Sequence, residues 1–302
     1  GPLSEIKPES CGIVMVESLE KAMRRPYHKK KLALVFANER HFALEQIERG
    51  VKLIYILTEG TFGSGLLQAQ NEFGLAHITT MHPAERELRL DLEQAIEAGL
   101  RLKYVEDTTW LSTDADFDSV YQSKPKQYVM DRFYRVMRTR TGILMDGKEP
   151  RGGKYSYDAD NRKPYRGEVA VPARPRFEND DITHEVLELV EKQFPNHFGT
   201  LDGFSLPVTA KDCLALWNFA LHRLLPHFGP WEDAMDTTEQ DLFHSKLSAL
   251  INLGRVLPRR VVADVAAACE AGNIPLASAE GFIRQILGWR EYMRHIHRVT
   301  DG

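Results

Sequence analysis

The first 110 residues alternate short apolar runs, rich in β-branched side chains, with longer segments of helical periodicity. Four runs have the composition of buried strands: residues 12–16, 51–57, 76–80 and 102–105. Helical spacing of apolar residues separates the first two runs over residues 32–47 and the last two over residues 84–100. This order predicts right-handed crossovers and a Rossmann-like parallel sheet that is covered by helices on both faces.

The ends of these strands are the expected place for a ligand. No strand is followed by GxGxxG, and the sequence contains no GxxxxGK followed by Ser or Thr, so neither a dinucleotide loop nor a nucleoside triphosphate loop is supported. Doubly wound sheets bind ligands outside the carboxyl ends of their strands. The sequence therefore favours a small ligand near Glu17 and Glu20, which follow the first strand.

The character of the chain changes from about Lys124. A basic helix is followed by a segment rich in Gly and Pro, and residues 148–176 carry eight Lys and Arg against four Asp and Glu. After Asp180 five helices are expected: residues 182–194, 210–225, 242–253, 258–271 and 277–299. We predict an α/β domain over residues 1–123, a connector over residues 124–180 and an all-α domain over residues 181–302, incomplete at its C-terminus.

Composition excludes several classes of protein. The 39 Lys and Arg against 43 Asp and Glu give a net charge of −4, which excludes a polycation but allows a local basic surface that binds nucleic acid. No apolar run approaches the roughly 18 residues of a membrane helix, and no secretory signal is recognised. A cytoplasmic protein without membrane contact is expected. The three scattered cysteines are expected to be reduced packing residues.

Two segments of the second half carry candidate binding residues. Ser245 and Ser248 stand where the helix over residues 242–253 is expected to begin, and free N–H groups with hydroxyls suit an anion; helix capping alone is the alternative. Trp289 and Arg290 could stack on and clamp a flat anionic ligand. The alternative is a core tryptophan beside solvated charges.

These segments carry a family resemblance. The stretch from Ser245 to Gly254 resembles the flavin-binding signature TSxLSPYLxxG of the photolyase/cryptochrome family, and residues 289–292 are similar to its WREF helix. Residues 228–233 resemble its YxxxRD element. Residues 152–164, GGKYSYDADNRKP, are similar to the interdomain segment GGKW(N/S)FDAENRK of the bacterial iron–sulfur (6-4) photolyase branch.

The resemblance implies roles for individual residues. The residues expected to lie along FAD are Ser245, Leu247, Ser248, Gln285, Trp289 and Arg290, and Gln285, Trp289 and Arg290 would also face the lesion. The residues expected to meet DNA are Lys154, Arg162, Lys163, Trp289 and Arg290, with a solvated loop as the alternative for the first three. Asp158 and Asp233 are candidates for Mg²⁺, with ordinary caps and turns as the alternative. Glu17 and Glu20 are candidates for a ribityl-lumazine antenna chromophore.

The implied activity is that of a carbon–carbon lyase of light-dependent DNA repair, in which reduced FAD passes an electron to a (6-4) pyrimidine lesion in damaged DNA. A non-catalytic cryptochrome-like photoreceptor or a degenerate remnant is the alternative. Relative to the branch, we expect a monomeric chain truncated at both ends, with an incomplete opening strand over residues 1–10. We also expect that this chain, without the family's C-terminal catalytic region, is not competent in repair alone and binds FAD weakly or not at all. No [4Fe–4S] cluster is expected in this chain although the family carries one.

Overall fold

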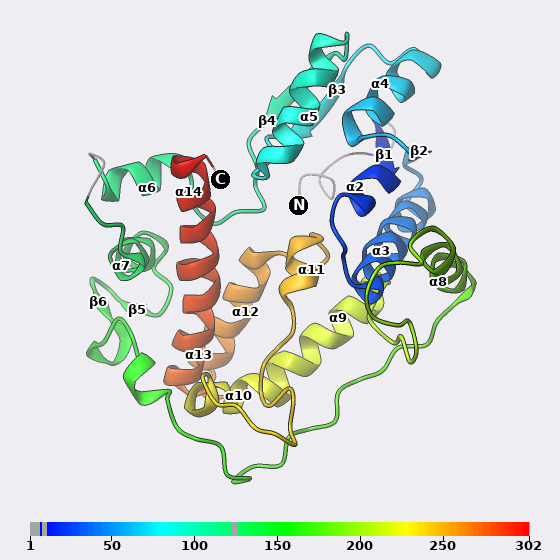
Figure 1. Cartoon of the computed structure of the whole chain (residues 1–302). Helices are drawn as coiled ribbons and strands as arrows, with labels where there is room; N and C mark the ends of the chain where they lie inside the picture. The colour runs from blue at the N-terminus through cyan, green and yellow to red at the C-terminus, as the bar shows by residue number, and fades with distance from the viewer. Residues whose placement is uncertain (1–6, 8–10, 123–125, 302) are drawn as a thin grey trace. The chain divides into compact units, whose positions relative to one another are not determined.

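The computed structural model describes residues 7, 11–122 and 126–301 (Figure 1). The chain forms two compact units. The first holds the chain up to Thr108 together with Arg176–Cys213, and the second holds Thr109–Pro175 together with Leu214–Gly302. These units differ from the expected domains, which followed the linear sequence. The expected connector over residues 124–180 is almost entirely part of the second unit.

The first unit contains two pairs of parallel strands. Strands β1 (Gly12–Ser18) and β2 (Lys52–Thr58) pair with Met15 opposite Tyr55, and strands β3 (Ile78–Met81) and β4 (Leu102–Val105) form the other pair. All four strands were predicted. The prediction of a single sheet is wrong for the described residues, in which β1–β2 and β3–β4 are separate two-stranded sheets. An apolar run indicates that a strand exists, but it does not specify the strand beside it.

Helices cover both faces of the β1–β2 pair. Helix α3 (Lys29–Glu48) reaches one face, where Arg40 pairs with Glu17. Helix α4 (Phe62–Glu72) reaches the other face, where a Cβ on Gly65 would lie 2.5 Å from Val16. Glu17 and Val16 point to opposite faces because side chains alternate along a strand.

The remaining helices of the first unit are α2 (Leu19–Met23), α5 (Arg86–Glu97) and α8 (Asp181–Gln193), with the first residues of α9 (Ala210–Phe219). Helices α3 and α8 lie side by side (Figure 1), and the rings of Phe36 and Phe194 meet at 6.1 Å between centroids. Cys213 is buried while Cys11 and Cys269 are half-buried, and all three are free thiols.

The second unit is mainly helical. Its elements before residue 180 are α6 (Asp114–Val120), α7 (Met130–Thr141), the antiparallel strands β5 (Met145–Asp146) and β6 (Glu149–Pro150), and the short helices η1 (Arg151–Gly153) and η2 (Asp158–Asp160). After α9 follow η3 (Ala220–Leu224), α10 (Leu225–Phe228), η4 (Gly229–Trp231), α11 (Ser248–Asn252), α12 (Pro258–Glu270), α13 (Leu276–Ile283), η5 (Arg284–Arg290) and α14 (Glu291–Thr300). The last three elements run as one helix with a π-type central segment.

The predicted helix over residues 242–253 is wrong at its N-terminal half. Helix α11 begins only at Ser248, because Leu242 and Lys246 adopt positive φ angles of 41° and 54°. Leu242, Phe243 and Leu247 are nevertheless buried. A folded loop buries these apolar residues as a helix would, which is why their spacing suggested one.

Two further expectations concern the opening residues and membrane-spanning helices. Residues 1–10, where an incomplete opening strand was expected, lie outside the described residues apart from Lys7. Within the described ranges, no helix is both long and apolar enough to cross a membrane.

Candidate functional site

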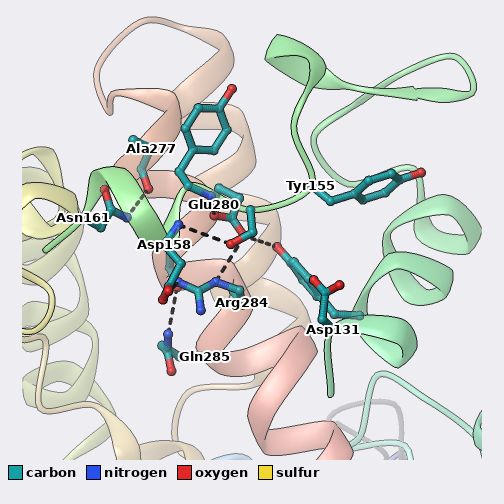
Figure 2. Close-up of polar contacts among 12 residues, drawn as sticks. Asp131, Tyr155, Asp158, Asn161, Ala277, Glu280, Arg284 and Gln285 are labelled. Carbon is teal, nitrogen blue, oxygen red and sulfur yellow. Dashed lines mark hydrogen bonds and ion pairs between the residues drawn. The ribbon is translucent and has the colours of Figure 1, made fainter. Parts of the chain in front are cut away.

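The interior of the second unit contains a polar cluster centred on Glu280 and Arg284 (Figure 2). The Glu280 carboxylate is fully buried and accepts a hydrogen bond from the Tyr134 hydroxyl at 3.0 Å and another from the Tyr157 backbone N–H at 2.8 Å. Arg284 lies one turn further along the helix, with its Nε 3.4 Å from Glu280 Oε1. Helix α13 is thereby tied to α7 and to the segment that follows β6.

Two more carboxylates complete the cluster. Nη2 of Arg284 lies 3.1 Å from Asp158 and 3.5 Å from Glu232. The Asn161 amide donates to Glu232 at 3.2 Å and to the Ala277 carbonyl at 3.1 Å. Short helices η2 and η4 place Asp158 and Glu232 at the same guanidinium, so one arginine lies between carboxyl groups from three segments.

Burial controls the ionisation of this cluster. It raises the pKa values of Glu280 and Glu232, although the charge of Arg284 opposes the shift in both carboxyl groups. Burial also lowers the pKa of Arg284, but Glu280, Glu232 and Asp158 outweigh it and the net shift is upward. The guanidinium therefore stays charged, and its charge favours the ionised form of the two buried carboxyl groups.

A stripe of accessible side chains runs along the outside of the same helix. Gln285, Trp289 and Met293 are spaced four residues apart, and Trp289 and Met293 are 43% and 52% exposed. The indole is fixed by an edge contact with Tyr292 at 6.1 Å between ring centroids. An exposed indole beside an amide can stack on a flat ring and hydrogen-bond its edge.

Arg290 points elsewhere, and the structure does not join it with Trp289 in one clamp. Its guanidinium carbon lies 3.7 Å from the centroid of the Trp110 ring, and its Nη1 donates to Glu291 at 3.1 Å. Consecutive residues of a helix face different directions. Arg290 thus stacks within the protein, while Trp289 remains at the surface.

The expected flavin-phosphate residues surround the start of α11. Leu247 is a core residue at 1% exposure, and Ser248 is exposed as the first helical residue. Lys246, between the two serines, forms an ion pair with Asp241. Ser245 lies in the loop before α11 and is half-buried, and its assignment to the FAD phosphates, like that of Ser248, stays a prediction.

The candidate DNA-contacting residues lie on a partly neutralised surface. Lys154 pairs with Asp160 at 3.2 Å, and Arg162 pairs with Asp158 and, at 3.7 Å, with Asp233. Lys163 is exposed. Asp158 and Asp233, the candidates for Mg²⁺, share one arginine, and the described residues contain no group of three or more potential metal ligands.

Both antenna candidates at the strand end of the first unit pair with arginines of the chain. Glu17 is fully buried, and both of its oxygens accept hydrogen bonds from Arg40, at 2.8 and 3.0 Å. Glu20 pairs with Arg24 and lines a cavity of about 10 Å³. Such a cavity holds about one water molecule. The antenna assignment of Glu17 and Glu20 stays a prediction.

Sequence reasoning missed the centre of the polar cluster. Glu280, Arg284, Glu232 and Asn161 were not candidates, although Glu280 and Arg284 are one helical turn apart in an apolar segment. Charges at that spacing within a stretch that is otherwise buried were the available signal.

Comparisons with known proteins identify relatives of this chain. Residues 1–206 match the family model of deoxyribodipyrimidine photo-lyase-related proteins. The chain is 36% identical over 291 residues to a (6-4) photolyase of Agrobacterium fabrum, covering 94% of this chain and 57% of that protein. It is 26% identical over 128 residues to an uncharacterised protein of Acanthamoeba polyphaga mimivirus, covering 41% of this chain and 65% of the relative.

The fold is similar to a crystal structure of a bacterial class III photolyase from Agrobacterium tumefaciens, with a TM-score of 0.55 at 13% identity. That match covers 95% of this chain and 53% of the solved one. The chain therefore spans little more than half the length of these photolyases. Since the family model covers more than half of the chain, the protein belongs to the deoxyribodipyrimidine photo-lyase-related family.

Proposed function

We propose that this chain acts in light-dependent DNA repair as a flavoprotein that passes an electron from reduced FAD to a (6-4) pyrimidine lesion. The observation that carries the proposal is the 36% identity to a protein named (6-4) photolyase over 94% of the chain. The similarity includes both compact units, and the exposed indole of Trp289 provides a surface on which an extruded base can stack.

Different residues of the chain would bind FAD and DNA. Ser245 and Ser248 would hold the FAD phosphates through their hydroxyls, while Leu247 anchors the loop in the core. Lys163 and the cationic groups of Lys154 and Arg162 would meet DNA phosphates. Bound and reduced FAD would supply the electron after absorbing light.

Binding of DNA to this surface would be electrostatic, and its affinity would depend on salt. Lys154 and Arg162 already pair with aspartates, so a phosphate must displace an exposed ion pair, which costs about 1 kcal/mol or less. Lys163 is exposed and ready to pair with a phosphate. We therefore expect binding to weaken steeply as salt rises.

A non-catalytic flavin-binding photoreceptor of the cryptochrome type is the second candidate. Residues 245–254 and 289–292 are similar to motifs of the family that includes cryptochromes as well as photolyases. Such a protein would bind FAD and respond to light without changing the lesion.

The decisive experiment illuminates the reduced, FAD-supplemented chain with a duplex that contains a single (6-4) lesion. Loss of the lesion in light but not in darkness supports the repair function, and a cyclobutane dimer in the same duplex reports on lesion choice. Trp289→Ala should reduce repair through weaker lesion binding, while Met235→Ala, at a loop side chain that is 93% exposed, should not. Light-dependent flavin absorbance changes without lesion loss would favour the photoreceptor.

A further inference from the structure

The Gln285 side chain has both of its amide protons engaged. Its Nε2 donates to the Glu232 carboxylate and, at 3.2 Å, to the backbone carbonyl of Gly281. A primary amide has two N–H donors at one end and a carbonyl acceptor at the other. The donor end of Gln285 is thus fully used inside the protein.

The chemistry of the two partners fixes which end of the amide faces inward. A carboxylate and a carbonyl can only accept, so the opposite orientation would place the Gln285 oxygen against two acceptors. In Figure 2 the nitrogen of Gln285 points toward the polar cluster and its oxygen points away. Gln285 therefore presents a hydrogen-bond acceptor on the stripe that includes Trp289.

Glu232 is itself held firmly in place. Its side chain is only 9% exposed, and it accepts from Asn161 at 3.2 Å and lies 3.5 Å from Nη2 of Arg284. A Cβ on Gly281 would lie 2.6 Å from Glu232 Oε2, so a glycine is needed for this close approach. The carboxylate reaches Gln285 because the helix has no side chain at that point.

We propose that Glu232 is a positioning residue that fixes the Gln285 amide with its carbonyl oxygen outward, so that this face selects a ring that donates a hydrogen bond. An unstacked pyrimidine with an imide N–H has the required chemistry: its ring stacks on Trp289 while its N3–H donates to Gln285. The inference deepens the proposed function and rests on it. Glu232 does not touch the ligand.

A pair of oligonucleotides tests this selection. Single-stranded oligothymidine of eight residues is compared with the same oligomer methylated at N3 of every base, which removes the imide donor but keeps the ring and the phosphates. Binding is followed by tryptophan fluorescence. The wild-type chain should prefer the unmethylated oligomer by about tenfold, the worth of one well-formed hydrogen bond.

Glu232→Gln should reduce this preference to below about threefold, because a glutamine amide can donate as well as accept and no longer dictates the orientation of Gln285. The matched control is Glu239→Gln, the same change at an exposed carboxylate, which should keep the full preference. Gln285→Met should abolish the preference while Trp289 still binds both oligomers.

The outcomes separate the inference from the function. A Glu232→Gln chain with undiminished preference overturns the inference, and so does a wild-type chain that repairs the lesion but binds both oligomers equally or neither. A chain that neither repairs nor binds overturns both.

A second measurement tests the orientation of Gln285 without using a Glu232 variant, which could fail to fold. The side-chain amide protons of Gln285, identified in nuclear magnetic resonance spectra by their loss in Gln285→Met, should exchange slowly with water in the wild-type chain. Fast exchange would contradict the fixed orientation.

Discussion

Glu280 and Arg284 lie one helical turn apart with 3.4 Å between Oε1 and Nε, and their side chains are 0% and 8% exposed. This pair connects α13 to Tyr134 of α7 and to Tyr157 of the segment that links β6 to α8. A buried ion pair contributes little compared with apolar residues of the same shape, but removing one partner strands the other charge. Loss of Glu280 would therefore leave the Tyr134 hydroxyl and the Tyr157 N–H without this acceptor and Arg284 with only Asp158 and Glu232.

Glu280→Leu should destabilise the second unit by about 3–5 kcal/mol, because Arg284 and the Tyr134 hydroxyl lose a buried partner. Urea denaturation followed by tryptophan fluorescence measures the change. Arg260→Ala, which removes an exposed i,i+4 pair with Asp264, is the control and should cost less than about 1 kcal/mol. A loss below that of the control would show that the cluster is not structural.

Glu39→Gln should stabilise the chain at pH 8. Burial, together with the charge of Glu17, raises the pKa of Glu39 to about 8, with Arg40 opposing the shift. The folded state therefore binds this proton more tightly than the unfolded state, and stability falls as pH rises from about 4.5 to 8. Glutamine removes that cost, which amounts to roughly 1–3 kcal/mol for a half-buried carboxyl group.

Thermal unfolding of the Glu39→Gln and wild-type chains across this pH range provides the check. Glu48→Gln, at an exposed carboxylate of the same helix, should leave the difference near zero at every pH. A stability difference for Glu39→Gln that is constant with pH would contradict the shifted pKa.

His295 should remain neutral far below the pH at which histidine usually becomes charged. Burial first, and then the charge of Arg294, lowers its pKa to about 4. The ring stacks on Phe117 with 4.9 Å between centroids, and its Nε2 lies 2.9 Å from the Ser112 hydroxyl. Because the folded state resists this proton, stability should be full above about pH 6.5 and fall as pH drops toward 4.

Ring proton shifts of His295, assigned from a His295→Asn chain, report this titration directly. They should stay constant down to about pH 5. Arg298→Met should move the midpoint upward, since Arg298 also lowers the pKa of this ring. A midpoint near pH 6.5 in the wild-type chain would refute the shift.

The sequence could predict those elements whose signal is local. Strands β1 and β2 followed from their β-branched runs, and α12 begins at Pro258 as predicted, because proline suits the first helical position. The start of α11 could not be predicted, since Leu242 and Phe243 are buried by a loop with the periodicity of a helix. Local patterns report burial, whereas backbone direction depends on contacts that are distant in sequence.

The polar cluster shows the same limit at the candidate site. Glu280 meets Tyr157 and Tyr134, which lie 123 and 146 positions earlier in the chain. No spacing rule connects residues so far apart, whereas Trp289 and Ser248 were found because they fall within short contiguous motifs. Motifs identified surface candidates, and the structure was needed to identify the buried polar contacts.

The flavin-phosphate assignment leads to a prediction at the start of α11. Ser248→Asp should weaken FAD binding by about tenfold or more, because it places a carboxylate beside the pyrophosphate. Riboflavin, which lacks phosphates, should bind equally to both chains, so fluorescence polarisation titrations with the two flavins isolate the phosphate contact. Ser119→Asp, at an exposed serine of α6, is the matched control and should leave both affinities unchanged. Equal losses for FAD and riboflavin would place the phosphates elsewhere and leave Ser248 with no role beyond starting the helix.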